Sequence, residues 1–345
     1  MTTGSTGGLA HASPPRISVI VPCFNQGAYL DEALDSVAAQ TCQDLEILVV
    51  DDGSTDEATL HILDALHRPA TVVVRSGNHG LSAARNLGAS RARGEFLCCL
   101  DADDRLAPGW LEAAVRLLDE DPELAFVSHW LETFGDERWE WKPTRCDLAM
   151  LLDRNTVNGA AVVRRDVFRA AGGFDETMRD GCEDWEFWIR VVARGHRGAI
   201  VPETLFHYRR HAGSMSREMH RGERFLQIYA DIIGKHPESC ARHLPDLVLR
   251  RERAIADTAT SIQAAEADLR TWLEPAVAER RREVARARAR LDEVLAVEEL
   301  RRQAAHASAR AAELERRVQA LHASWSWRVT APLRRLYEWA GLARR

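Results

Sequence analysis

The chain has 345 residues and a formal net charge of −6, with 46% hydrophobic and 28% charged residues. This balance is typical of a soluble globular protein with one large domain and an appendage, or with two ordinary domains, and it argues against a nucleic-acid binder. The seven cysteines include no CxxC pair, which disfavours a disulfide framework and a zinc knuckle. A reducing cytoplasm is therefore the expected location.

Short β-rich runs alternate with helical runs from residue 17 to about residue 131, after a leader (residues 1–15) that is expected to be flexible. Continuous apolar strands separated by helices predict a parallel sheet covered on both faces. Ligands of such sheets bind at the carboxyl ends of the strands. Strands are expected at 17–21, 45–50, 72–74 and 96–100, and helices at 29–40, 56–66 and 81–92.

Polar clusters follow three of these strands and predict a ligand site at one sheet edge. In the last cluster, Asp101 and Asp103 are two residues apart, so in an extended strand both carboxylates would point the same way and could hold one hard cation such as Mg²⁺. Asp104 is expected to cap the helix that follows. The clusters span residues 22–26, 51–56 and 101–104.

An aromatic-rich region lies between about residues 126 and 208, where the pair Glu183 and Asp184 precedes a predicted helix at 185–194. Trp185 is predicted to be the most surface-facing tryptophan of this region. A tryptophan ring beside carboxylates such as Glu183 and Asp184 can line a sugar-binding cleft by stacking. Packing in the core is the alternative. The tryptophans of this region are Trp130, Trp139, Trp141, Trp185 and Trp188.

The C-terminal third is rich in Ala, Arg, Glu and Leu, which predicts a helical, partly coiled-coil region over 217–322. Its small-residue seam could pair with a second chain as a homo-oligomer, or fold back on a helix at 246–272 with Pro275 as the break. Both interpretations stay open. The seam consists of Leu300, Ala304, Ala307, Ala311, Leu314, Val318 and Leu321.

The final segment (323–345) is a basic aromatic tail. Aromatic residues interleaved with Arg predict an amphipathic helix that contacts a membrane surface, with packing against the coiled region as the alternative. No run approaches the roughly 18 apolar residues of a spanning helix, so such a contact would be peripheral. Nucleic-acid binding is disfavoured because the body is acidic.

Six sequence blocks are spread over residues 16–216, at 19–25, 50–56, 78–88, 100–104, 172–176 and 183–188. Their residues and their order resemble the family 2 inverting glycosyltransferases of the GT-A fold, of the bacterial surface-polysaccharide type. This resemblance implies an α/β, Rossmann-like, mostly parallel sheet flanked by helices, with a nucleotide-binding half (16–130) and an acceptor half (131–216). It also implies an enzyme that is cytoplasmic and peripheral on the inner face of the plasma membrane.

The resemblance implies a role for each matching residue. Asp101 and Asp103 would form the family's DxD motif. Asp103, with His211 or alternatively His207, would hold Mn²⁺ or Mg²⁺. Asp184 would be the general base, since inversion by direct displacement needs a carboxylate to take the proton of the acceptor hydroxyl. Glu183 and Trp185 would contact the acceptor. The donor nucleotide would be bound by Pro22, Phe24, Asn25, Asp52, Arg85 and Asp101.

The predicted reaction transfers a hexosyl or N-acetylhexosaminyl group from a nucleotide-diphosphate donor, with UDP favoured, to a saccharide or lipid-linked acceptor. A sugar-nucleotide pyrophosphorylase is one alternative, but it would need a Gly-rich turn with Arg and Lys that residues 22–25 do not offer. The other alternative is a catalytically inactive scaffold whose helical tail organises a glycan-assembly complex.

Overall fold

The computed structural model describes residues 14–211, 213, 223–289 and 297–325. The chain forms two compact units, one ending at Ser239 and the other beginning at Cys240. The first unit extends past residue 216 because α9 (Glu223–Lys235) packs into it. The hydroxyl of Tyr229 donates a hydrogen bond to the backbone oxygen of Leu152 (2.9 Å).

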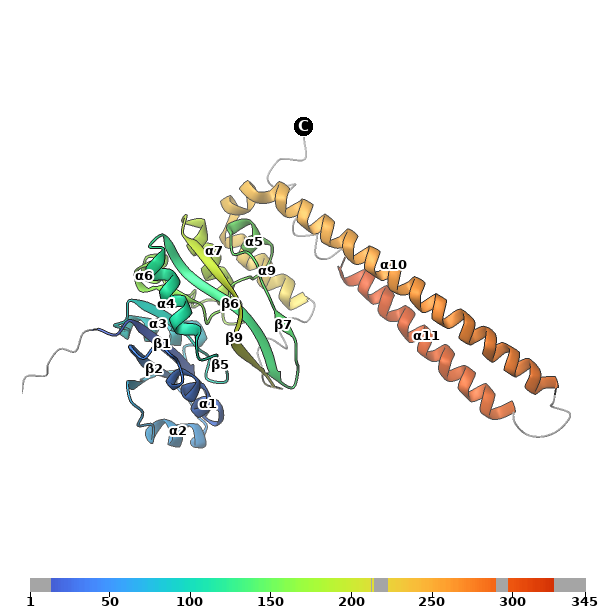
Figure 1. Cartoon of the computed structure of the whole chain (residues 1–345), viewed down its shortest axis with the longest axis horizontal. Helices are drawn as coiled ribbons and strands as arrows, with labels where there is room; N and C mark the ends of the chain where they lie inside the picture. Colours follow the sequence, from blue (N-terminus) through green and yellow to red (C-terminus); the bar gives the residue numbers. More distant parts are fainter. Residues whose placement is uncertain (1–13, 212, 214–222, 290–296, 326–345) are drawn as a thin grey trace, which may run out of the picture. The chain divides into compact units, whose positions relative to one another are not determined.

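A nine-stranded sheet forms the centre of the first unit (Figure 1), in the order β3-β2-β1-β4-β8-β6-β9-β5, with β7 paired to β6. Its first four strands are parallel, as predicted from the sequence, and α1, α2 and α3 alternate with them. These elements are β1 (Ile17–Cys23), α1 (Gly27–Ala38), β2 (Leu45–Asp52), α2 (Glu57–Asp64), β3 (Thr71–Ser76), α3 (Leu81–Arg91) and β4 (Phe96–Cys99).

The second half of the sheet is mixed. Strand β8 is antiparallel to β4 and to β6, β6 is parallel to β9, and the short strands β5 and β7 are antiparallel to their neighbours. The elements are β5 (Arg105–Leu106), α4 (Trp110–Glu120), β6 (Leu124–Gly135), β7 (Glu140–Trp141), α5 (Leu148–Asp153), β8 (Val162–Arg164), α6 (Arg165–Ala171), α7 (Glu183–Ala193) and β9 (Arg197–Arg210).

Helices cover both faces of the parallel strands. Val19 and Val21 point to one face and pack in a core with residues of α1 and α4, because side chains alternate along a strand. Ile20 points to the other face, towards α3. A Cβ atom on Gly88 of α3 would lie 2.4 Å from Cγ2 of Ile20, so a residue without a side chain lets helix and sheet approach. This scaffold fixes the strand ends.

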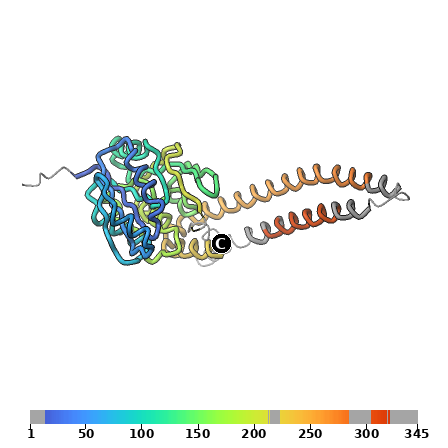
Figure 2. Tube along the Cα trace, turned by 90° about the horizontal axis from the view of Figure 1, so that it is seen from below, coloured from blue at the N-terminus to red at the C-terminus, as the bar shows by residue number. Residues whose placement is uncertain are grey.

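The second unit is built from two long helices, α10 (Pro237–Ala289) and α11 (Val297–Trp325), as the trace in Figure 2 shows. The predicted break at Pro275 is wrong. Pro275 lies inside α10, since a proline removes only one backbone donor and the flanking Ala, Glu and Arg residues favour helix. Within the described residues, no helix is both long and apolar enough to cross a membrane.

The predicted seam on α11 is not buried where its side chains are described. Ala304, Ala307 and Leu314 are exposed, and Ala311 is partly covered. Residues 326–345, which carry most of the predicted basic aromatic tail, lie outside the described residues, as do residues 1–13 of the predicted leader. The choice between oligomer and hairpin therefore stays open.

Candidate active site

The loop after β1 places an exposed aromatic ring beside a firmly bonded asparagine. Phe24 is 41% exposed, whereas Pro22 is buried. The Oδ1 atom of Asn25 accepts hydrogen bonds from the backbone N–H groups of Thr55 (2.8 Å) and Asp56 (2.9 Å). Asn25 thus joins the loops after β1 and β2 and shapes the rim on which the Phe24 ring lies.

Asp52 ends β2 and is 4% exposed. Its two carboxylate oxygens accept hydrogen bonds from the backbone N–H groups of His79 (2.9 Å) and Gly80 (2.8 Å). Gly80 has a φ of 96°, which glycine adopts readily, and it forms the turn that begins α3. Asp52 therefore holds this turn in place. Its predicted contact with a nucleotide base stays a prediction.

The acidic cluster after β4 forms a turn, because the backbone N–H of Asp104 donates to the backbone oxygen of Asp101 (3.0 Å). The extended-strand argument for aligning Asp101 and Asp103 is therefore wrong. The capping role predicted for Asp104 is also wrong, since α4 begins only at Trp110. The Asp104 carboxylate instead accepts a hydrogen bond from the backbone N–H of Arg209 (2.7 Å).

Asp103 and His211 form the candidate metal pair. Oδ2 of Asp103 lies 3.1 Å from Nε2 of His211, and burial together with the Asp101 charge raises the pKa of Asp103. An oxygen and an imidazole nitrogen this close suit a divalent cation that takes its other ligands from phosphates and water. Among the residues that the structure describes, no group of three or more His, Cys, Asp or Glu side chains could hold a metal. His207 lies elsewhere, 2.9 Å from Glu132.

Helix α1 supports this pair through residues that the sequence did not single out. The His211 ring stacks on Tyr29, with 5.4 Å between ring centroids. The guanidinium of Arg209 lies 4.8 Å from the centroid of the Tyr29 ring and pairs with Glu32. Its Nε donates to the backbone oxygen of Asp103 (2.7 Å). Tyr29 and Glu32 are three residues apart and so share a helix face, which is the one signal that could have found them.

Arg85, on α3, is 4% exposed and lies between two carboxylates. Its Nη2 donates to Oδ1 of Asp101 (2.6 Å) and its Nη1 pairs with Glu183. Burial opposes its charge, but the two carboxylates raise the pKa of Arg85 well above its usual range. Arg85 thereby ties the turn after β4 to the start of α7. Its predicted contact with the nucleotide stays a prediction.

Asp184 lies in the first turn of α7, next to this ion pair. Its Oδ1 accepts hydrogen bonds from the backbone N–H of Trp185 (2.6 Å) and from Nδ2 of Asn155 (3.3 Å). Burial and the neighbouring Glu183 carboxylate raise the pKa of Asp184 to about 7, while Arg85 acts in the opposite direction. A carboxylate with a pKa near neutrality is well matched to general-base chemistry.

The two predicted acceptor contacts require correction. Trp185 is 2% exposed, not surface-facing, because its ring stacks on Tyr229 with centroids 5.4 Å apart and its indole N–H donates to the backbone oxygen of Leu151 (2.6 Å). Glu183 is 6% exposed and engaged by Arg85, so it does not present a free carboxylate to an acceptor. In this region the exposed tryptophan is Trp139, at 44%.

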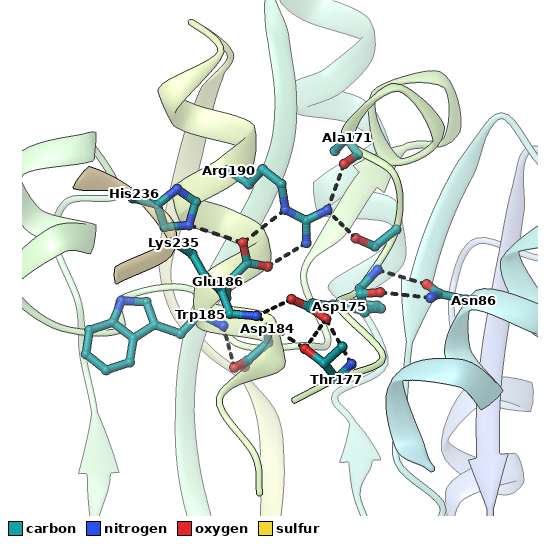
Figure 3. A network of polar contacts seen from close by, with 12 residues as sticks. Asn86, Ala171, Asp175, Thr177, Asp184, Trp185, Glu186, Arg190, Lys235 and His236 are labelled. Carbon is teal, nitrogen blue, oxygen red and sulfur yellow. Dashed lines mark hydrogen bonds and ion pairs between the residues drawn. The ribbon is translucent and has the colours of Figure 1, made fainter. Parts of the chain in front are cut away.

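A second buried carboxylate, Glu186, anchors α7 from its other side (Figure 3). It lies 3.1 Å from Nε of Arg190 and 3.1 Å from Nε2 of His236. Arg190 also donates to the backbone oxygens of Ala171 (2.7 Å) and Gly173 (2.8 Å). This network holds in place the helix that carries Asp184.

The chain matches two family models. The model of glycosyl transferase family 2 matches residues 18–176, and that of glycosyltransferase-like family 2 matches residues 145–246. A PGL/p-HBAD biosynthesis glycosyltransferase of Mycobacterium bovis is 32% identical over 183 residues, which cover 52% of this chain and 70% of that protein. The chain belongs to glycosyl transferase family 2.

One further relative and two solved structures are also similar to the chain. An uncharacterized glycosyltransferase of Haemophilus influenzae is 28% identical over 219 residues, covering 59% of this chain and 68% of that protein. A crystal structure of S. aureus TarS in complex with UDP-GlcNAc has a TM-score of 0.55 at 19% identity and covers 66% of each chain. The mannosyltransferase PcManGT from Pyrobaculum calidifontis, in complex with GDP-Man and Mn²⁺, has a TM-score of 0.52 at 22% identity and covers 74% of this chain and 81% of that one. The predicted GT-A fold is confirmed.

Proposed function

We propose that this family 2 glycosyltransferase is a metal-dependent, inverting enzyme that transfers a sugar from a nucleotide-diphosphate donor. The observation that carries the proposal is the division of carboxylates at one sheet edge. Asp103 is next to an imidazole, at 3.1 Å, whereas Asp184 is held apart in a setting that raises its pKa to about 7. Asp103 is therefore suited to bind a cation, and Asp184 is suited to accept a proton.

Donor binding is assigned to the first half of the unit. The exposed ring of Phe24 would lie beside the base, and Asp101 would face the ribose from its ion pair with Arg85. Asp103 and His211 would hold Mn²⁺ or Mg²⁺, which when bound stabilises the charge of the leaving diphosphate. The protein itself would fix the direction of that pair through Tyr29 and Arg209.

Proton transfer is assigned to Asp184. The acceptor hydroxyl would attack the anomeric carbon while Asp184 takes its proton, and the bond from that carbon to the diphosphate oxygen would break on the opposite face, which inverts the configuration. Arg85 would keep the neighbouring Glu183 engaged in an ion pair, so that a single carboxylate is available at the start of α7.

The donor and acceptor are proposed more coarsely. UDP is the favoured nucleotide, and a hexosyl or N-acetylhexosaminyl group is the favoured sugar. TarS is a fold neighbour in complex with UDP-GlcNAc. PcManGT is in complex with GDP-Man, so a guanine nucleotide is the alternative donor. The acceptor would be a saccharide or a lipid-linked saccharide in cell-surface polysaccharide synthesis.

The helices α10 and α11 would form a coiled coil, within one chain or between two, and the segment 323–345 would contact the inner face of the plasma membrane.

Thermal unfolding of the full chain with UDP-GlcNAc, UDP-glucose or GDP-mannose, with and without Mn²⁺, tests donor binding, because a ligand that binds only the folded state raises its stability. We expect one sugar nucleotide to raise the unfolding temperature more with Mn²⁺ than without, and Asp103→Ala to abolish the metal-dependent part. Asp136→Ala, in the loop after β6, is the control that should keep it. An Asp103→Ala protein with an unchanged metal response would contradict the metal assignment.

A catalytically inactive scaffold is the alternative function. The exposed seam residues of α11, such as Leu314 at 38% exposure, favour a role for the second unit in assembly. A folded protein that binds no sugar nucleotide and shows no turnover with any of the three donors would favour the scaffold.

A further inference from the structure

The segment between α5 and β8, residues 154–161, runs directly beside Asp184. The side chain of Asn155 has a fixed orientation within it. Its Oδ1 accepts a hydrogen bond from the backbone N–H of Val157 (3.1 Å). A backbone N–H can only donate, so this bond sets which end of the amide is oxygen. Nδ2 is then the atom that lies 3.3 Å from Oδ1 of Asp184.

Buried indoles anchor this segment. The N–H of Trp188 donates to the backbone oxygen of Asn158 (3.2 Å), and that of Trp110 donates to the backbone oxygen of Ala160 (3.2 Å). Both rings are fully buried, at 1% and 0% exposure, and large rings locked by packing hold a hydrogen-bond partner in one place. The segment is therefore a rigid support for Asn155.

The charged and titratable groups around Asp184 come from three elements. Glu183 and Cys182 precede it at the start of α7, Arg85 faces it from α3, and Asp101 acts from the turn after β4. The Asn155 amide is a neutral donor among them. Within the described residues both donors to Asp184, the Trp185 N–H and the Asn155 amide, use Oδ1, which leaves Oδ2 without a hydrogen bond to this part of the protein.

We propose that Asn155 is a positioning residue for Asp184, whose amide holds Oδ1 and leaves Oδ2 to take the proton of the acceptor hydroxyl. This inference rests on the proposed role of Asp184 as the base. In the step, the O–H bond of the acceptor breaks, its proton goes to Oδ2, the acceptor oxygen bonds to the anomeric carbon, and the diphosphate leaves with the electron pair of the broken C–O bond. In this role Asn155 acts through Asp184, to which its amide is bonded.

The titration of Asp184 tests this inference without any substrate. We would label the full chain with ¹³Cγ-aspartate and identify the Asp184 resonance by its absence in Asp184→Asn. Asn155→Asp keeps the acceptor for the Val157 N–H but replaces the donor by a negative charge. Since both changes disfavour the ionised form of Asp184, its midpoint should rise by roughly one pH unit or more.

Asn158→Asp is the matched control, because the Oδ1 atom of Asn158 accepts from the backbone N–H of Ala160 (2.9 Å) in the same way, whereas the donors to Asp184 among the described residues are Trp185 and Asn155. The pair Asn155→Ala and Asn158→Ala repeats the comparison without adding a charge, and a smaller rise is expected for Asn155→Ala alone. Midpoints that are equal within either pair would overturn the inference.

Turnover separates this inference from the function on which it rests. If Asp184→Asn keeps its activity, the base assignment fails whatever the midpoints are. If Asp184→Asn loses activity while Asn155→Asp titrates like Asn158→Asp, only the positioning role of Asn155 fails.

Discussion

The two halves of the first unit, one proposed to bind the donor and the other the acceptor, use their conspicuous aromatic side chains in opposite ways. In the first half, the aromatic ring that follows β1 stays on the rim, since Phe24 is 41% exposed. In the second half, Trp185 and Trp188 are buried, at 2% and 1% exposure, and donate their indole N–H groups to backbone oxygens. The end of a parallel strand therefore predicts where the side chains that follow it lie. A tryptophan in the mixed region can pack in the core or line a sugar-binding cleft, and the sequence does not distinguish the two.

Arg85 is buried between a carboxylate of each half, Asp101 and Glu183, so its removal should have the largest effect on stability. Arg85→Ala would leave Glu183 as a buried, unpaired charge and is expected to lower the free energy of unfolding by about 3–5 kcal/mol, measured by urea denaturation. Arg75→Ala, which breaks a surface pair with Asp64, is the control and should cost under about 1 kcal/mol. Equal losses in the two variants would show that the buried ion pair does not join the halves.

Trp185→Phe tests whether this tryptophan is structural. The variant removes the donor to the Leu151 oxygen and part of a packed ring, which should lower the free energy of unfolding by about 2 kcal/mol. Trp139→Phe, at an exposed position, should change it by about 0.5 kcal/mol or less. A Trp185→Phe protein of unchanged stability would restore the interpretation that its ring faces a ligand.

Asp184→Asn should stabilise the protein in a pH-dependent way. The raised pKa means that the folded state holds its proton more tightly than the unfolded state, so wild-type stability falls as the pH rises from about 4 to about 7. The Asp184→Asn variant has no ionisable group at this position, so its stability does not fall in this way. It should therefore be more stable than wild type by about 1–3 kcal/mol at pH 8 and equal to it near pH 4, measured by thermal unfolding at both values. A difference that is the same at both pH values would contradict the raised pKa.

Asp147→Ala should have the smallest effect. Asp147 is the N-cap of α5, where its side chain accepts a hydrogen bond from the backbone N–H of Met150 (3.1 Å). Its loss is expected to cost about 1 kcal/mol of unfolding free energy, and Asp147→Asn, which keeps an oxygen acceptor, should recover most of it. If the asparagine variant were as unstable as the alanine variant, the cap would not be the cause.

The parallel half of the fold could be predicted because its strands are continuous apolar runs and its polar clusters follow them directly. The conformation of the Asp101–Asp104 turn could not, since one backbone hydrogen bond decides it. The spacing of Tyr29 and Glu32 indicates only a shared helix face. That Tyr29 supports His211, and Asn155 supports Asp184, depends on contacts between residues far apart in the chain. The predicted break at Pro275 is wrong for a different reason, since the surrounding helix-forming residues outweigh the loss of one backbone hydrogen-bond donor.

The most direct test of the account compares donor binding and turnover in a single variant. Asp184→Asn should bind the preferred sugar nucleotide with Mn²⁺ within about two-fold of wild type, because the donor contacts are assigned to other carboxylates. Its kcat should fall by roughly 10²–10⁴-fold, as expected when a general base is lost. Turnover close to that of wild type, with donor binding intact, would contradict the assignment of proton transfer to Asp184.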